Sequence, residues 1–126
     1  MIKAKELKVY IEDTQTFKEK IKKELKAIDV GRAKTLKEDS ISFQSLSQFR
    51  KFLTPKRLEL LRVVRHKKPK SIYELSKFVK RTPENVNTDI KFLEQLGFIG
   101  LTKVREIRPK VIPEVDYNKM TVEIPI

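Results

Sequence analysis

Hydrophobic and polar residues alternate near the start of the chain. Leu7, Val9 and Ile11 are separated by polar neighbours, and this spacing of two is typical of a strand with one buried face. A second, shorter strand is predicted at residues 41–43. Between the two strands the spacing changes to three and four residues, which predicts a helix with one apolar stripe. The stripe consists of Phe17, Ile21, Leu25 and Ile28.

Four helices are predicted between residues 45 and 96. The second and the fourth begin with threonine followed by proline, at residues 54–55 and 82–83, where the missing proline N–H costs nothing. The third begins with a capping box formed by Ser71 and Glu74. The apolar faces of the four helices are predicted to consist of Leu46, Phe49 and Leu53; Leu58, Leu61 and Val64, with Leu60 beside them; Ile72, Leu75, Phe78 and Val79; and Val86, Ile90 and Leu93.

The last two helices, residues 71–80 and 83–96, are joined by only a few residues, as in a helix-turn-helix pair. A strand containing Ile99 and Leu101 follows, and then the basic stretch 103–110. A basic connection between two strands after a helix-turn-helix is typical of a wing. The second of these strands is predicted at the C-terminus, where the alternating apolar residues are Met120, Val122, Ile124 and Ile126.

The predicted fold class is therefore α+β, a winged helix-turn-helix with an N-terminal strand–helix extension. The extension covers residues 1–40, and the winged helix-turn-helix domain covers residues 41–126. Two roles remain open for the apolar stripe of the extension: packing on the core of the domain, or forming the interface of a homodimer.

Positive charge is concentrated in the middle of the chain. The sequence holds 29 Lys and Arg and 17 Asp and Glu, a formal net charge of +12. Residues 45–110 alone hold 17 of the basic and 6 of the acidic residues. The excess thus lies on the predicted helix-turn-helix segment, as expected for a surface that binds nucleic acid. The alternative is a solvated lysine-rich surface with no such partner.

Nothing in the sequence points to catalysis. Cysteine is absent, which excludes disulfides, thiolate metal sites and cysteine nucleophiles. Three glycines do not make a phosphate-binding loop, and no carboxylate cluster accompanies His66, the single histidine. We expect no enzymatic activity, no cofactor and no metal. Because the chain has no long apolar run, we expect a cytoplasmic protein that makes no contact with membranes.

The helix at residues 83–96 is the candidate recognition helix. With its apolar stripe buried, its opposite side presents amide, hydroxyl and ammonium groups, which can bond base edges in the major groove. The alternative is an ordinary solvated helix face. Asp89 is expected to form a structural salt bridge with a nearby Lys or Arg. The candidate base-reading residues are Arg81, Thr82, Asn85, Asn87, Thr88 and Lys91.

Basic residues before and after this helix-turn-helix are candidates for contacts with the nucleic-acid backbone. The first group lies in the turn that precedes residue 72, and the second lies in the predicted wing. The first group consists of Lys67, Lys68, Lys70 and Ser71, and the second of Lys103, Arg105, Arg108 and Lys110.

Three stretches of the sequence also resemble a known family. They are SFQSLSQFRKFLTPKRLELLR, SIYELSKFVKRTPENVNTDIKFLEQLGFIGL and the ending RPKVIPEVDYNKMTVEIPI. They resemble a family of MarR-like predicted winged-helix regulators from archaea and some bacteria. The resemblance implies a cytoplasmic transcriptional regulator. Some members of that family look like antitoxins, which implies a small toxin protein as a further partner.

The function predicted from these observations is sequence-specific binding of double-stranded DNA, as a homodimer, to regulate transcription. Two alternatives remain open. The first alternative is an antitoxin that neutralises a small toxin and regulates its own operon. The second is a protein that binds structured RNA.

Overall fold

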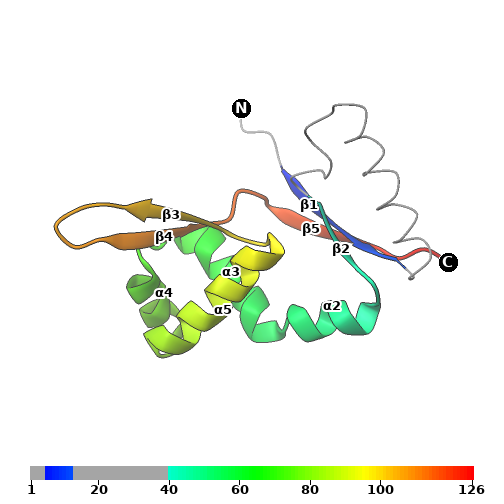
Figure 1. Cartoon of the computed structure of the whole chain (residues 1–126), viewed down its shortest axis with the longest axis horizontal. Helices are drawn as coiled ribbons and strands as arrows, with labels where there is room; N and C mark the ends of the chain where they lie inside the picture. Colours follow the sequence, from blue (N-terminus) through cyan, green and yellow to red (C-terminus); the bar gives the residue numbers. More distant parts are fainter. Residues whose placement is uncertain (1–4, 13–39) are drawn as a thin grey trace, which may run out of the picture. The chain divides into compact units, whose positions relative to one another are not determined.

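The computed structural model describes residues 5–12 and 40–126. The described helices and strands form an α+β fold with four helices and two small sheets, in agreement with the predicted class (Figure 1). The helix predicted to carry Phe17, Ile21, Leu25 and Ile28 lies outside the described residues.

The chain divides into two compact units. The first, here called the helical unit, comprises Leu53–Asn118 together with Met1–Lys5. The second, called the sheet unit, comprises Glu6–Phe52 and Lys119–Ile126. The division expected from the sequence, after residue 40, therefore differs from the division in the structure. The reason is that the last strand of the chain pairs with the first one.

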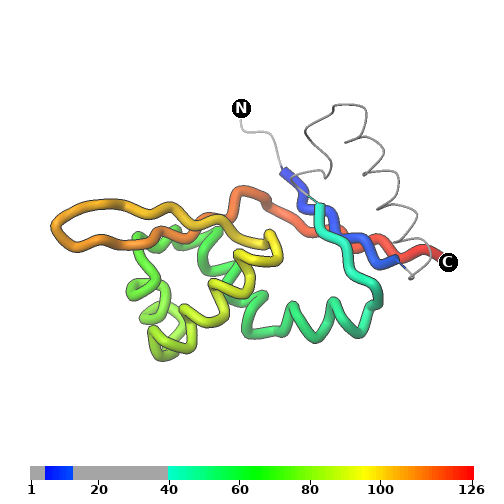
Figure 2. Tube along the Cα trace, viewed as in Figure 1, coloured from blue at the N-terminus to red at the C-terminus, as the bar shows by residue number. Residues whose placement is uncertain are grey.

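The sheet unit is built on three parallel strands. They are β1 (Glu6–Ile11), β2 (Ser40–Phe43) and β5 (Lys119–Glu123), in the order β2-β1-β5. The two strands predicted in the first part of the chain are confirmed. In Figure 2, β1 and β5, near opposite ends of the chain, run side by side.

One face of this sheet is apolar and the other is polar. Val9 is paired with Ile41 in β2 and with Val122 in β5, and paired residues lie on the same face. On the opposite face the Glu6 carboxylate accepts a hydrogen bond of 2.8 Å from the Thr121 hydroxyl. This bond, and to a smaller extent the nearby Lys119 ammonium, holds the pKa of Glu6 below its ordinary value. The apolar face consists of Leu7, Val9, Ile11, Ile41, Phe43, Met120 and Val122.

The short helix α2 (Leu46–Phe52) packs its aromatic residues on the end of β2. The ring of Phe43 lies 5.5 Å from that of Phe49 and 5.8 Å from that of Phe52, between ring centres. Of the inward positions predicted for this helix, Phe49 and Leu53 are half-buried, although Leu53 follows the last residue of the helix. Leu46 was predicted wrongly, since it is 42% exposed at the first turn.

The helical unit contains three longer helices, α3 (Pro55–Lys67), α4 (Ile72–Val79) and α5 (Pro83–Leu96). Each starts where the sequence predicts, because the side chain of the residue before it accepts a hydrogen bond from a backbone N–H in the first turn. These N-cap residues are Thr54, Ser71 and Thr82.

The core of the helical unit forms where these helices meet the residues that follow α5. Phe78 was predicted wrongly as an inward residue: it is 38% exposed, on the flank of α4 that faces away from buried Ser76. Leu58, Ile72 and Val79 are half-buried, whereas Leu60 is fully buried. The buried core residues are Leu60, Leu61, Val64, Leu75, Val86, Ile90, Leu93, Phe98, Ile99 and Val115.

A β-hairpin follows α5. Its strands, β3 (Gly100–Val104) and β4 (Lys110–Glu114), are antiparallel, and β4 packs against α3 and α4. The prediction that the C-terminal residues provide the second strand was therefore wrong. The sequence pattern of β4 is interrupted by Pro113, which is tolerated there because β4 pairs with a described strand on one side only.

The segment after β4, residues 115–118, is hydrogen-bonded to the rest of the helical unit. The Tyr117 hydroxyl donates to the Phe98 carbonyl oxygen at 2.7 Å, and Arg65 donates to the carbonyl oxygen of Val115 at 3.4 Å. Burial raises the pKa of Tyr117 far above its ordinary value, and the adjacent Asp116 carboxylate adds to this effect. The phenol is therefore neutral at neutral pH and donates this hydrogen bond.

Candidate nucleic-acid interface

The helix α5 is held at both ends by local hydrogen bonds. Thr82 Oγ1 accepts from the backbone N–H of Asn85 at 3.2 Å, and Pro83 occupies the first helical position. At the other end Gly97 has a φ of 94°, a left-handed conformation that glycine adopts without strain. Its N–H and that of Phe98 bond back to the last turn.

The exposed face of α5 follows from its buried residues. Because Val86, Ile90 and Leu93 are buried, the residues on the opposite side lie at intervals of four, three and four. Lys91 and Thr88 lie on this face as predicted, and Asn85 is also exposed, whereas Asn87 is half-buried on one flank. The central stripe of the face consists of Glu84, Thr88, Lys91 and Gln95, all of them exposed.

Glu84 and Gln95 were missed by the sequence analysis, although the helical spacing opposite the buried stripe contains the signal for both. Thr88 is partly engaged, since its hydroxyl donates to the Glu84 backbone carbonyl at 3.0 Å. It can still accept a hydrogen bond from a ligand. The stripe thus offers a carboxylate, a hydroxyl, an ammonium and an amide to whatever lies against it.

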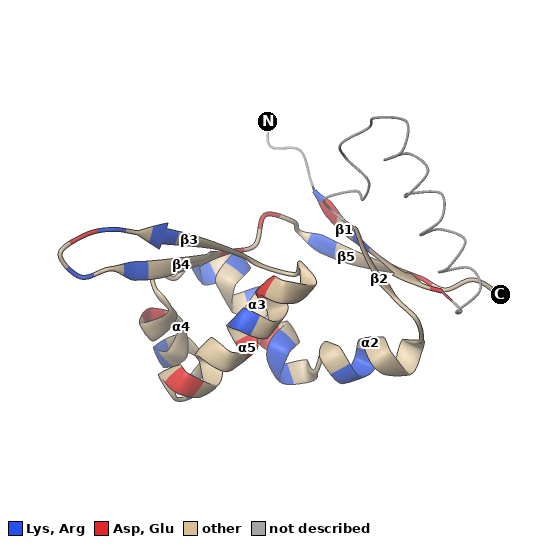
Figure 3. Cartoon of the chain, in the orientation of Figure 1, with Lys and Arg blue, Asp and Glu red and all other residues tan. Residues whose placement is uncertain are grey.

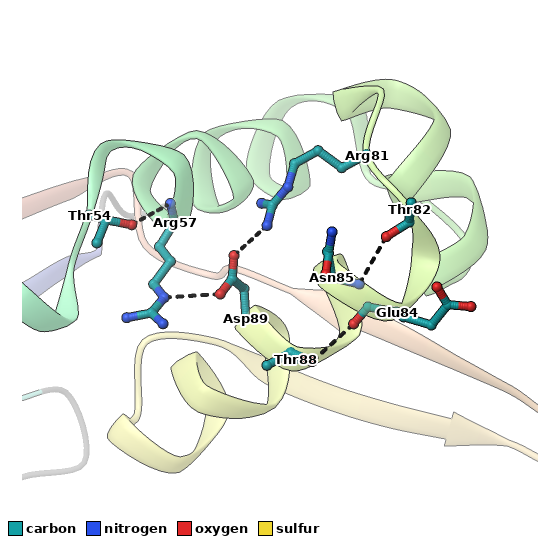
Figure 4. A network of polar contacts seen from close by, with 8 residues as sticks. All are labelled: Thr54, Arg57, Arg81, Thr82, Glu84, Asn85, Thr88 and Asp89. Carbon is teal, nitrogen blue, oxygen red and sulfur yellow. Dashed lines mark hydrogen bonds and ion pairs between the residues drawn. The ribbon is translucent and has the colours of Figure 1, made fainter.

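Asp89 lies between two arginines, as Figure 4 shows. Its Oδ1 accepts from Nε of Arg57 in α3 at 3.1 Å, and its Oδ2 accepts from Nη2 of Arg81 at 2.7 Å. The side chains are 15%, 21% and 20% exposed, respectively, so the ion pairs are largely shielded from water. The Arg57 guanidinium also stacks 4.2 Å above the ring of Phe92. The structural salt bridge expected for Asp89 is confirmed.

These ion pairs connect α5 to α3 and to the turn before α5. They also turn Arg81 toward the protein, because its guanidinium points at Asp89 in Figure 4. Its Nη1 atom is buried and has no hydrogen-bond partner among the described residues. Arg81 therefore lies beside the exposed face of α5 but does not belong to it.

Basic residues occur in both strands and in the loop of the β3–β4 hairpin, where Figure 3 colours the ribbon blue. Lys103, Arg105 and Arg108 are exposed, and Lys110 is half-buried in the strand. Ile107, at the turn of the hairpin, is fully exposed. An apolar residue between two arginines at an exposed turn is a feature that the sequence analysis did not single out. The sequence itself carried the signal, in the run from Val104 to Arg108.

The turn between α3 and α4 is also basic. Lys67, Lys68 and Lys70 are exposed, and Ser71 is half-buried and caps α4. The φ of Lys68 is 47°, a left-handed conformation, and its N–H bonds the Val64 carbonyl oxygen, which ends α3. The turn therefore holds three ammonium groups on a short, well-defined backbone.

Two aromatic rings on α4 are covered by lysines, which the sequence analysis did not anticipate. Lys77 Nζ lies 4.6 Å above the ring of Tyr73, and Lys67 Nζ lies 5.0 Å above that of Phe78. Tyr73 is 53% exposed. Such pairs hold the ammonium groups at a defined place on the surface of α4.

Metal sites and membrane-spanning helices can be assessed for the described residues. No group of three or more His, Cys, Asp or Glu side chains there is arranged to hold a metal ion. None of the helices in this part of the chain has the length and hydrophobicity that crossing a membrane requires.

One family model, named HVO_A0114, matches residues 52–122, which is more than half of the chain. The chain belongs to the HVO_A0114 family. The segment shared with HVO_A0114 proteins runs from the end of α2 to the fourth residue of β5. It thus contains α3, α4, α5 and the hairpin, with all the candidate interface residues described above. No curated protein and no solved structure matches the chain.

Proposed function

We propose that this HVO_A0114 protein is a sequence-specific, double-stranded DNA-binding regulator of transcription, and that its helical unit is a winged helix-turn-helix. The observation that carries the proposal is the setting of α5. A capped helix, buried on one side and tied to α3 through Asp89, presents hydroxyl, amide and ammonium groups on its other side. The resemblance to MarR-like regulators agrees with this function.

In this proposal α5 enters the major groove, with its N-terminal half nearest the bases. Lys91 donates to guanine or to phosphate, Asn87 pairs with adenine, and Thr88 contacts thymine. Glu84 accepts from the cytosine amino group. Arg81 positions α5 through Asp89, which replaces the base-reading role predicted for it from the sequence. Thr82 and Asn85, at the start of α5, remain candidates for base or phosphate contacts.

The hairpin is the wing of the proposed fold, and it lies along the DNA backbone together with the α3–α4 turn. Arg105 and Arg108 are exposed on both sides of Ile107, so the turn of the hairpin suits a minor groove. The ammonium groups of the α3–α4 turn contact phosphates, and they position the protein without reading sequence.

A second candidate function, binding of structured RNA, is favoured by one observation. Tyr73 is more than half exposed on α4, beside Lys77, and unstacked bases of RNA stack on such rings. The extended basic wing and the polar stripe of α5 favour duplex DNA, so we place RNA second.

The test begins with a selection of bound duplexes from a random-sequence DNA library. The expected result is one consensus site, bound at least about a hundredfold more tightly than scrambled DNA and than an RNA hairpin at two salt concentrations. Enrichment of no consensus, or tighter binding of the hairpin, would contradict the proposal.

Substitutions then locate the reading surface. We expect Asn87→Ala and Lys91→Ala each to weaken binding to the selected site by about 1–3 kcal/mol and binding to scrambled DNA only slightly. Lys67→Ala is the matched control, because removing a phosphate-binding ammonium group from the α3–α4 turn weakens binding to both duplexes equally. If Asn87→Ala weakens binding to both duplexes equally, the proposed placement of α5 in the major groove is wrong.

A further inference from the structure

The outer edge of β5 is unpaired within the described part of the chain. β5 pairs with β1 on one side, and the described strands place nothing on its other side. Its residues are exposed except for Met120, which is half-buried, and Val122 is 37% exposed. An edge of this kind presents backbone N–H and C=O groups that can pair with another strand.

The sequence of this edge is complementary to itself. The five residues of β5 are Lys119, Met120, Thr121, Val122 and Glu123. If two copies of β5 run antiparallel with Thr121 opposite Thr121, each Lys119 lies opposite a Glu123. Each Met120 then lies opposite a Val122. Opposite charges, hydroxyl pairs and apolar pairs are the cross-strand neighbours that stabilise antiparallel sheets.

The alternatives to this register are poorer. A shift by one residue would bring apolar side chains of one copy to the polar face of the other. Centring the pair on Val122 would place Lys119 opposite Pro125, which has no N–H to donate. The apolar face of each sheet also continues across the centred pair, because Met120 and Val122 lie on that face in both copies.

We propose that two copies of this chain associate through β5, so that the two three-stranded sheets become one six-stranded sheet with a two-fold axis at Thr121. The occupant of the edge is thus a second copy of the chain. The association by itself does not depend on DNA. That it pairs two helical units for a palindromic site rests on the function proposed above.

A charge-exchange experiment tests the pairing by sedimentation equilibrium without DNA. Glu123 forms no ion pair with the described residues, and Glu123→Lys places two lysines opposite two lysines. We expect the dimer dissociation constant to rise about tenfold or more for this variant and for Lys119→Glu. A mixture of the two variants restores opposite charges at both positions, and it is expected to dimerise like the original protein.

Two controls accompany these variants. Lys119 also lies 3.4 Å from the Glu6 carboxylate, so circular dichroism and thermal melting establish that Lys119→Glu remains folded. Lys51→Glu makes the same charge change on an exposed position of α2 and leaves the dimer unchanged.

A single cysteine tests the register. The protein has no cysteine, so a disulfide in Thr121→Cys can form only between two copies. Opposite residues of antiparallel strands have Cα atoms about 4.5–5.5 Å apart, within the range that a disulfide spans. Oxidation with diamide is expected to give a covalent dimer of Thr121→Cys and none of Lys119→Cys, whose counterpart lies four residues along the partner strand.

The outcomes separate this inference from the proposed function. A monomer that still selects a DNA consensus would overturn the β5 pairing alone. A dimer that is unaffected by both charge variants would also overturn it, and would direct attention to the stripe formed by Phe17, Ile21, Leu25 and Ile28. Weaker dimerisation of Glu123→Lys and recovery in the mixture would establish the β5 interface, whether or not DNA is bound.

Discussion

Asp89 shows how one side chain determines what a helix can present. This carboxylate on α5 accepts from Arg57 on one side and from Arg81 on the other. Its charge is therefore neutralised inside the protein. The same two bonds fix the rotation of α5 about its axis, because they connect it to α3 and to the turn before it.

We predict that Asp89→Ala destabilises the protein by about 2–3 kcal/mol in urea unfolding. The reason is that two largely buried guanidinium groups are then left without the charge that compensates them. Glu94→Ala is the matched control, since it removes a carboxylate from an exposed position of the same helix. Its expected effect is within about 0.5 kcal/mol. Similar destabilisation by the two variants would show that the Asp89 ion pairs contribute little.

At the scale of elements, the hairpin is the feature that the sequence described least well. Its basic residues were recognised, but its second strand was assigned to the C-terminus. β4 contains Pro113, and only one side of it pairs with a described strand. β4 therefore lacks the alternation of polar and apolar residues that identified β5 in the sequence. Only its backbone pairing with β3 identifies it as a strand.

We predict that replacing both Arg105 and Arg108 by alanine lowers affinity for every DNA sequence. Each phosphate contact contributes about 0.9 to the slope of log affinity against log salt, so the slope should fall by about two units. Filter binding over a series of salt concentrations measures it. The control combines Lys8→Ala with Lys51→Ala, which removes two exposed charges from the sheet unit. A slope that does not change would place the wing outside the interface.

At the scale of the whole molecule, the C-terminal strand pairs with the N-terminal strand. β5 completes the sheet that β1 starts, and the sheet unit is therefore built from the two ends of the sequence. The helical unit is inserted between them. Its last residue, Asn118, donates a backbone hydrogen bond to the Lys5 carbonyl oxygen at 3.0 Å, within that same unit.

We predict that a chain ending at Asn118 loses the sheet but keeps the helices. Removing β5 exposes Leu7 and Val9 and leaves β1 with one described partner strand, so amide hydrogens of β1 and β2 should exchange quickly. Those of α3, α4 and α5 should stay protected. A chain ending at Glu123 is the control, because it retains all of β5. Loss of protection in α5 as well would show that the helical unit depends on the sheet.

Much of the local structure could be predicted because local rules decide it. Threonine before proline determined where α3 and α5 begin, and the helical spacing of Val86, Ile90 and Leu93 determined which side of α5 is buried. Phe78 was assigned wrongly because its place on the flank of α4 depends on what packs beside it. The exposed stripe of α5 followed the same spacing, so Glu84 and Gln95 could have been found.

The sequence by itself determined the charge, the N-caps of α3, α4 and α5 and the buried face of α5, since these depend on residues a few positions apart. Only the tertiary structure decided that β5 pairs with β1, because strand pairing joins segments separated by more than a hundred residues. It also decided that Arg81 contacts Asp89. A guanidinium is long enough to reach either solvent or a carboxylate, and here the fold places Asp89 between Arg81 and Arg57 of α3.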